Sequence, residues 1–145
     1  MKIYIATDHA GFELKNRLKE FLQSRNYDVE DCGALVLDSS DDYPDFILPA
    51  AKKVAEDNNS KGIILGGSGQ GEAMAANRIK GVRAMVYYDG PNEIVKLSRM
   101  HNNANIISFG ARFVSYEKAV EVLKIWLDEE FEGGRHEARI NKLDL

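Results

Sequence analysis

The most unusual peptide in the sequence is the glycine-rich segment Gly66–Glu72, which reads GGSGQGE. Four glycines in six positions allow the backbone to turn its N–H groups toward one point. A predicted helix follows, and the first N–H groups of a helix are unsatisfied and carry partial positive charge. This pattern predicts a site for an anion, either a phosphate group or an oxyanion that develops during a reaction. The alternative is a flexible turn without a ligand, although a turn needs only one or two glycines.

Two well-known nucleotide-binding motifs do not fit this segment. A P-loop ends in Gly-Lys-Ser/Thr, whereas Gly71 is followed by Glu72. The fingerprint G-x-G-x-x-G fits Gly67 and Gly69 but then requires glycine at position 72, and it belongs after the first strand of a domain rather than the third. The sequence therefore argues against nucleotide and NAD binding.

Three acidic or basic residues stand next to predicted strands or at the start of a helix. Glu72 lies where a helix dipole stabilises a carboxylate by roughly 0.3–1 kcal/mol. It is either an ordinary acidic residue of a first helical turn or a general base beside the anion site. Asp8 and His9 follow the first predicted strand. There Asp8 can accept hydrogen bonds from sugar hydroxyl groups, and His9 can contact an anion.

The C-terminal half contains two further groups of candidates. His101 and Asn102 end a predicted helix, and we expect them near the carboxyl ends of the strands. Their alternative role is to cap that helix. Arg135 and Arg139 are four residues apart and share one helix face. They form either a bidentate clamp for phosphate, which Arg112 can join, or a solvated face whose repulsion neighbouring glutamates relieve.

Short apolar strands alternate with amphipathic helices along the chain. The predicted strands are Lys2–Thr7, Tyr27–Asp31, Lys61–Leu65, Val82–Tyr87 and Asn105–Phe109, and the predicted helices are Glu13–Arg25, Phe46–Asp57, Glu72–Ile79, Asn92–His101, Tyr116–Glu129 and Arg135–Leu143. Such alternation implies parallel pairing through right-handed crossovers. The sequence therefore predicts an α/β fold, a three-layer Rossmann-like sandwich with a five-stranded parallel sheet in the order 2-1-3-4-5.

In this strand order the first and third strands are neighbours. Ligands of such sheets bind beyond the carboxyl ends of the strands, where the strand order reverses. The first strand is followed by Asp8 and His9, and the third by the glycine-rich segment. We therefore expect these two peptides to meet and to form the functional site.

Composition places the chain among ordinary globular proteins. It has 145 residues and a formal charge of −4, with 19 basic and 23 acidic residues. We expect one domain over residues 1–145, and the acidic balance argues against a general nucleic-acid binder. The single cysteine, Cys32, forms no internal disulfide and no cysteine-rich zinc site. No apolar run approaches the roughly 20 residues of a membrane span, and the N-terminal residues lack the apolar core of a signal peptide. We expect a cytoplasmic protein that does not associate with membranes.

Five separated segments resemble the ribose-5-phosphate isomerase B family, which includes galactose-6-phosphate isomerase subunits and allose-phosphate isomerases. They are MKIYIATDHAGFELK, DYPD, GIILGGSGQGEAMAANRIKGVRA, RMHNNANIISFGAR and EGGRHEARI. The resemblance runs in the same order from residue 1 to about residue 143. It implies aldose–ketose isomerisation of a phosphorylated sugar through a cis-enediolate, without a metal ion or cofactor.

The resemblance also identifies a general base. In much of the family the base is a cysteine directly before the glycine-rich loop, but that position is Gly66 in this chain. A second branch of the family uses a glutamate after the loop, and the matching residue is Glu72. The resemblance therefore implies that Glu72 removes the proton from C2 of the aldose and returns it to C1.

Further roles follow from the same resemblance. Ser68 would move a proton between the O1 and O2 oxygens, His101 would open the sugar ring, and Asn102 would bind a reacting oxygen. Asp8 would assist with the hydroxyl groups, and Tyr43 would wall the pocket. The enediolate would be held by the N–H groups of Gly67, Gly69, Gln70 and Gly71. The phosphate would be held by His9, Arg112, Arg135 and Arg139, with His136 nearby.

In the family the active site forms between two subunits, and the partner supplies His101 and part of the phosphate clamp. We therefore expect a homodimer or tetramer, in which the helix at about 135–143 reaches the partner subunit. One alternative is an isomerase of another phosphorylated aldose, such as allose 6-phosphate, galactose 6-phosphate or a tetrose phosphate. Another is a non-catalytic sugar-phosphate-binding module, which would not need Glu72 or His101.

Overall fold

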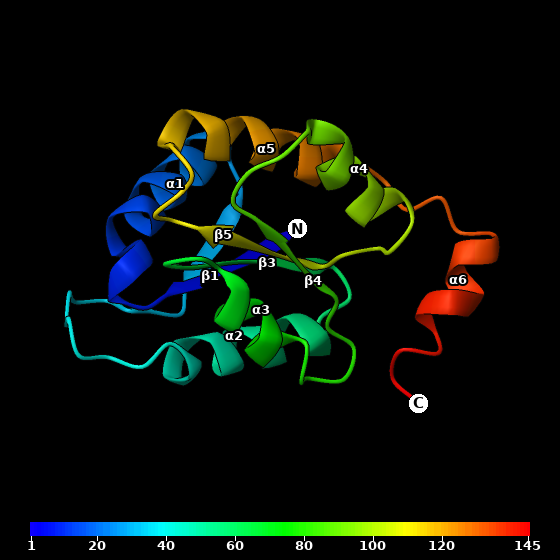
Figure 1. Ribbon diagram of the computed structural model, residues 1–145, viewed down its shortest axis with the longest axis horizontal. Coiled ribbons are helices and arrows are strands. Elements are labelled where there is room, and N and C mark those ends of the chain that lie inside the picture. Colours follow the sequence, from blue (N-terminus) through cyan, green and yellow to red (C-terminus); the bar gives the residue numbers. More distant parts are fainter.

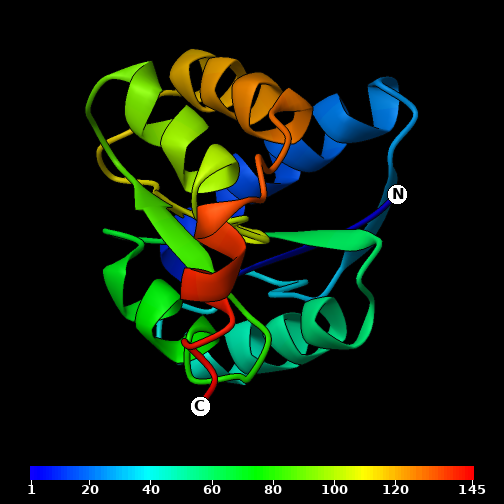
Figure 2. The ribbon, with the colours of Figure 1, turned by 90° about the vertical axis from the view of Figure 1, so that its right-hand side faces the viewer.

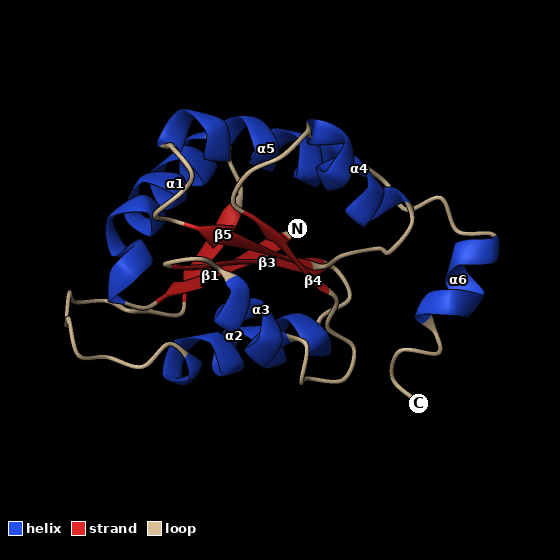
Figure 3. Cartoon of the chain, in the orientation of Figure 1, coloured by secondary structure: helices blue, strands red, loops and turns tan.

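Five parallel strands form one sheet with helices on both faces in the computed structural model, which describes residues 1–145 (Figures 1 and 3). The strands are β1 (Lys2–Thr7), β2 (Asp28–Asp31), β3 (Ser60–Gly66), β4 (Ala84–Tyr87) and β5 (Ile106–Gly110). The helices are η1 (His9–Gly11), α1 (Phe12–Ser24), α2 (Pro44–Glu56), α3 (Gln70–Ala76), α4 (Asn92–Met100), α5 (Tyr116–Asp128) and α6 (Arg135–Ile140). The predicted three-layer α/β sandwich is confirmed, and only the short 3₁₀ helix η1 was absent from the prediction.

The core lies in two layers, one on each face of the sheet. Helices α1, α4 and α5 cover one face, and α2 and α3 cover the other (Figure 3). Successive side chains of a strand point to opposite faces, so Ile5 packs in the first layer and Ala6 in the second. Because both faces are covered, the central strands β3 and β5 are buried along almost their whole length.

The strand order is β2-β1-β3-β5-β4, so the predicted order 2-1-3-4-5 is wrong at its end. β5 pairs with both β3 and β4. All five residues of β5 are buried, whereas three of the four residues of β4 are only partly buried, and this difference suits β5 to a central place and β4 to the edge. The spacing of elements along the sequence is the same for either order and therefore did not reveal the exchange.

The exchange also decides which face α4 covers. The chain steps back from the edge strand β4 to β5, and a right-handed crossover in that direction places its helix on the face that α1 occupies. The predicted order would have placed α4 beside α2 and α3. The strands β1 and β3 are neighbours in both the predicted and the observed order, so their carboxyl ends meet as predicted.

The two ends of the sheet differ in what surrounds them. At the carboxyl end, on the left of Figure 1, β1 runs into η1 and β3 runs into the glycine-rich loop. At the amino end, on the right, α6 stands away from the sheet, and Figure 2 shows it in front of the strands. The observed α6 ends at Ile140, shorter than predicted. No helix has the length and apolar character needed to cross a membrane.

Candidate functional site

The glycine-rich loop presents unpaired backbone donors. The N–H groups of Gly67, Ser68 and Gly69 donate no hydrogen bond to any atom of the chain. The N–H of Gln70 donates to Ser68 Oγ at 3.2 Å, so this predicted donor is already engaged. Gly69 has a φ of 79°, a left-handed conformation that favours glycine, and it directly precedes α3. The loop therefore offers a row of free donors to a ligand.

The carbonyl groups of the same loop point into the protein. The Gly66 carbonyl accepts from Ala111 N at 2.8 Å, and the Gly67 carbonyl accepts from Arg112 N at 3.1 Å. The Gly69 carbonyl accepts from Ser108 Oγ at 2.6 Å. Because these carbonyls are tied to β5 and to the residues after it, the N–H groups are held in place before any ligand binds.

Glu72 is buried directly beside this loop, with 4 % of its surface exposed. A Cβ atom on Gly66 would overlap the Glu72 carboxylate, so the carboxylate fills the space that a side chain at position 66 would need. Burial raises the pKa of Glu72, and the nearby charge of Asp8 raises it further. A carboxylate with a raised pKa is suited to proton transfer near neutral pH. The first turn of α3 thus places the Glu72 carboxylate beside Gly66, the position to which the resemblance assigns the catalytic thiol of the other branch.

The end of β1 contributes a second group of side chains. Asp8 is 8 % exposed, and its Oδ1 accepts from Ala10 N at 2.9 Å, which begins η1. His9 lies next along the chain and is close enough to Arg112 for that guanidinium to oppose protonation of its ring. The Arg112 guanidinium in turn lies against Gly67, with its Cζ 3.2 Å from an ideal Cβ there. The predicted phosphate ligands His9 and Arg112 therefore meet beside the glycine-rich loop.

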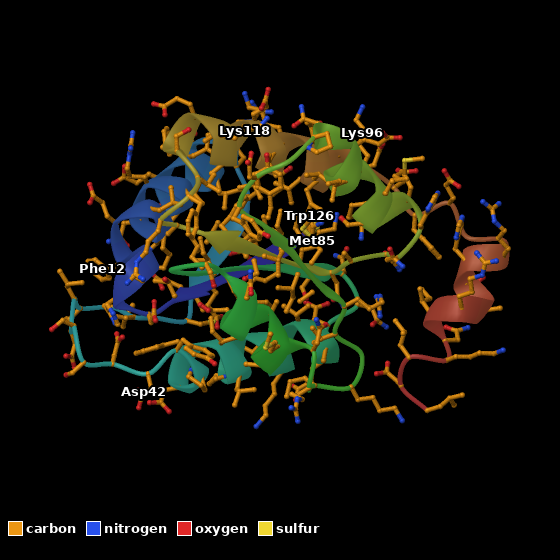
Figure 4. The ribbon with its side chains drawn as sticks, in the orientation of Figure 1. Phe12, Asp42, Met85, Lys96, Lys118 and Trp126 are labelled. Carbon is orange, nitrogen blue, oxygen red and sulfur yellow. The ribbon has the colours of Figure 1, made fainter.

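Asp41 was not among the sequence candidates, although it holds His9 in place. Its Oδ1 accepts from the His9 backbone N–H at 3.1 Å and lies 2.7 Å from His9 Nδ1. The hydrogen bond to Asp41 raises the pKa of His9. Asp41 belongs to the loop beyond the carboxyl end of the sheet where Figure 4 labels Asp42. The acidic run DSSDDYPD was the available signal, but nothing in it indicated which carboxylate faces His9.

Tyr43 and a neighbouring cavity complete this end of the molecule. The Tyr43 hydroxyl lies 2.7 Å from an ideal Cβ on Gly71, so the tyrosine packs directly on the first turn of α3 as predicted for a pocket wall. Ser68 and Gln70 line a cavity of about 360 Å³ together with Tyr88, Asp89 and Phe113. The seryl side chain is thereby open to a ligand rather than buried in the core.

The remaining candidates lie at the opposite end of the sheet. His101 directly follows α4, which runs antiparallel to the strands, so it lies at the amino end; our expectation that it lies near the carboxyl end is wrong. Its ring stacks on that of His136 from α6, with centroids 4.1 Å apart and planes 15° apart. Asn102 directly follows His101, and α6, which carries Arg135 and Arg139, lies at this same end (Figure 2). One chain therefore brings together ten of the fifteen predicted site residues, and the other five lie at the opposite end of the sheet.

Two clusters offer metal-ligating atoms within 4.8 Å of one another. One comprises His101, Glu132 and His136, but the two imidazole rings stack face to face and their in-plane lone pairs do not converge. In the other, made of Asp8, His9 and Asp41, Asp41 already binds His9. The first geometry does not favour metal coordination, and the second favours the hydrogen bond between Asp41 and His9.

Comparison with known proteins finds relatives that match almost the whole chain. The family profile described as ribose/galactose isomerase matches residues 3–143. Ribose-5-phosphate isomerase B of Mycobacterium tuberculosis is 39 % identical over 144 residues, which cover 99 % of this chain and 88 % of that protein.

Two crystal structures show the same fold. Ribose-5-phosphate isomerase B of Mycoplasma genitalium, solved with bound ribulose 5-phosphate, superposes with a TM-score of 0.93 at 38 % identity, covering 98 % of this chain and 93 % of that one. The enzyme of Thermotoga maritima gives a TM-score of 0.92 at 40 % identity, covering 99 % and 97 %. The chain therefore belongs to the ribose/galactose isomerase family, as an isomerase of the ribose-5-phosphate isomerase B type.

Proposed function

We propose that the protein interconverts ribose 5-phosphate and ribulose 5-phosphate through a cis-enediolate, with Glu72 as the base that carries the proton between C2 and C1. The observation that carries the proposal is the position of the Glu72 carboxylate, which fills the space beside Gly66 next to a loop with three free N–H groups. A base and a set of oxyanion donors are the two elements that enediolate chemistry requires. The ribulose 5-phosphate bound to the Mycoplasma genitalium relative supports this choice of substrate.

The loop stabilises the charge that develops when the proton leaves C2. A donor aimed at a developing oxyanion contributes about 2.7–4 kcal/mol. Gly67 and Gly69 donate from the backbone, and Gly71 adds a donor from the first turn of α3. Because the loop carbonyls are already tied to the residues of β5 and beyond, little reorganisation accompanies the reaction.

Ser68 is the group that exchanges protons with the two substrate oxygens. Its Oγ accepts from the Gln70 N–H at 3.2 Å, which leaves the hydroxyl hydrogen free to be donated to a ligand. The second lone pair of Oγ can take the proton from O2 while the hydroxyl hydrogen passes to O1, so Ser68 is unchanged after the transfer. Asp8, buried at the end of β1, accepts from the hydroxyl groups of the sugar chain.

The phosphate is bound by His9 and Arg112 of the same chain. The hydrogen bond to Asp41 raises the pKa of His9 and so favours the charged ring that attracts a phosphate. Arg112 adds a planar set of donors on the loop side.

The remaining groups of the site come from a partner subunit. His101 for ring opening, Asn102 for a reacting oxygen, and Arg135 and Arg139 for the phosphate lie at the amino end of the sheet, away from Glu72. A homodimer or tetramer with two-fold symmetry can place the amino end of one chain against the carboxyl end of the other, and reciprocally. His136 lies beneath His101 and fixes its ring by stacking.

A panel of aldose phosphates tests the proposal. The purified protein is incubated with ribose 5-phosphate, allose 6-phosphate, galactose 6-phosphate and erythrose 4-phosphate, and ketose formation is measured. The proposal expects the highest kcat/KM with ribose 5-phosphate. A higher value with another aldose would replace the substrate but keep the mechanism, and no ketose from any of them would overturn the isomerase reaction itself.

A further inference from the structure

A second cavity lies at the amino end of the sheet, away from Glu72 and His9. Its volume is about 310 Å³. It lies where α2 leads into β3 and where the chain enters β4 and β5. Its wall includes three cationic side chains and three amides, which are Lys61, Arg83, Arg99, Asn58, Asn103 and Asn105. The proposed isomerase reaction uses none of these residues.

The two arginines are held in place by neutral groups. Arg99 donates from Nε to the Glu129 carbonyl at 3.1 Å and from Nη1 to the Ala104 carbonyl at 2.7 Å. Arg83 donates from Nε to the Asn103 carbonyl at 2.9 Å. The Nη2 group of each guanidinium donates to no atom of the chain, and burial lowers the pKa of both arginines. Each arginine thus has a fixed, charged guanidinium whose Nη2 group is free to donate to a ligand.

Lys61 adds a third positive charge. Its ammonium lies 5.5 Å from the centre of the Trp126 ring, and the Arg99 guanidinium lies 6.0 Å from the same ring, which Figure 4 shows between α5 and the sheet. The Lys61 ammonium makes no hydrogen bond and no ion pair within the chain. Burial, and then repulsion by Arg99, lower its pKa to about 8.

Nearby carboxylates only partly offset these charges. Asp128 and Glu130 attract Lys61, Asp144 attracts Arg83, and Asp57 lies on the wall of the cavity. None of them lies within ion-pair distance of the three cations. A folded chain pays electrostatic free energy to gather like charges in this way, and a bound anion recovers it.

We propose that Lys61, Arg83 and Arg99 form a second anion site, which binds a phosphate group, either free or as the terminal phosphate of a small metabolite. Two fixed guanidinium groups match the oxygen atoms of a tetrahedral dianion, and the lysine supplies the remaining charge. The cavity volume accommodates a phosphate with a small organic substituent. The site is separate from His9 and Arg112 of the same chain, and none of its three cations is among the groups assigned to the substrate.

Acylation of lysines measures occupancy of this site directly. With a pKa of about 8, about half of the Lys61 amines are neutral at pH 8, against less than about one per cent for an ordinary lysine. A limiting amount of acetic anhydride should therefore modify Lys61 faster than Lys96, which is exposed on α4 (Figure 4), as followed by mass spectrometry of peptides. If a bound phosphate raises the pKa of Lys61 by one unit, the neutral fraction at pH 8 falls from about one half to about one in eleven.

The arms of the experiment separate the two sources of phosphate. Inorganic phosphate and glycerol 3-phosphate are compared with sodium chloride at equal ionic strength. Slower acylation of Lys61, with an unchanged rate at Lys96, is expected with at least one of the two. Slower acylation with inorganic phosphate but not with glycerol 3-phosphate indicates a site for the free ion. A larger decrease with glycerol 3-phosphate indicates a site for a phosphomonoester. Equal rates in all three solutions would overturn the proposal.

Counting bound phosphates gives an independent test. Calorimetric titration with inorganic phosphate should find two sites per chain in the wild type and one in Lys61→Met, which keeps the aliphatic stem over Trp126. Arg112→Met should lose the other site, and Lys61→Arg should restore both. The same number of sites in Lys61→Met and wild type would contradict the proposal. Because Lys61 lies outside the proposed reaction, Lys61→Met should isomerise ribose 5-phosphate at the wild-type rate.

Discussion

The two ends of the sheet differ in how their charged groups are held. At the carboxyl end, Glu72 and Asp8 are more than nine-tenths buried, and the loop carbonyls are tied to neighbouring backbone and side-chain donors. At the amino end, Arg135 and Arg139 stand exposed on a short helix that lies beyond the strands. The first end is organised by its own chain, whereas the second presents charged groups that the chain does not use. The contrast is what the proposed shared site requires: groups that need accurate placement are fixed at the carboxyl end, and exposed cations at the amino end are left for a partner subunit.

The largest expected effect comes from removing the buried base. Glu72→Gln should lower kcat by roughly 10²–10⁴-fold, the usual range for general acid–base catalysis, because the amide cannot accept the C2 proton. Steady-state kinetics check this result. Glu117→Gln is the matched control, since Glu117 also lies in the first turn of a helix but is exposed on α5. Near-normal turnover of Glu72→Gln would remove Glu72 from the reaction.

The next largest effect is expected from filling the space beside Gly66 that the Glu72 carboxylate occupies. Gly66→Ala places a methyl group where the carboxylate lies, so Glu72 must move toward solvent. Misplacement of a catalytic group by about 1 Å costs on the order of 10²-fold in rate.

The pH dependence of Gly66→Ala distinguishes a moved base from a damaged fold. Burial raises the pKa of Glu72 above its ordinary value of 4.5, and the carboxylate must be ionised to act, so wild-type kcat/KM falls as the pH drops through this raised pKa. Exposure of the carboxylate should shift that acidic limb to lower pH. A folded Gly66→Ala protein with unchanged rate and limb would show that the carboxylate does not occupy this space.

Mixing two inactive variants tests whether the two ends meet across an interface. Glu72→Gln and Arg139→Ala are combined under conditions that exchange subunits. About half of the dimers become mixed, and each contains one intact site and one doubly defective site, so about a quarter of all sites should recover. Activity that stays at the sum of the parents, despite exchange proven by mass spectrometry, would rule out the shared site.

A smaller effect is expected from the carboxylate that holds His9. Asp41→Asn removes the charge that raises the pKa of His9, so KM should rise several-fold with little change in kcat. The charged ring binds phosphate, and its affinity is lost as the pH rises through the pKa of His9. In Asp41→Asn this loss should begin at lower pH. Asp42→Asn, which alters the exposed neighbour, should resemble the wild type, and an identical pH profile for both variants would contradict the role of Asp41.

No effect is expected at the single cysteine. Cys32 lies directly after β2 and is not among the residues that meet at the glycine-rich loop, and burial raises the pKa of its thiol. Cys32→Ser should therefore keep the wild-type kcat/KM, and alkylation should not inactivate the enzyme. Loss of turnover in a folded Cys32→Ser protein would mean that a thiol takes part.

The sequence was sufficient for elements whose pattern is local. Alternating apolar strands and amphipathic helices indicated the layers, and the neighbouring positions of β1 and β3 indicated where Asp8 and the glycine-rich loop would meet. Helix boundaries were less accurate, since α3 begins two residues earlier than predicted, at Gln70. The glycine at 69 adopts the left-handed conformation that starts this helix, which the hydrophobic pattern does not encode.

The sequence by itself determined the α/β class, because the alternation of strands and helices depends on residue type and order along the chain. It also led us to propose an anion site at the glycine-rich loop and Glu72, rather than Cys32, as the base. Only the tertiary structure decided that β5 lies between β3 and β4, that Asp41 holds His9, and that His101 lies at the far end of the sheet from Glu72. These three facts depend on which side chains and strands meet across long separations in sequence. Contacts between residues distant in sequence depend on the packing of buried faces and the pairing of polar groups, and a local sequence pattern does not specify them.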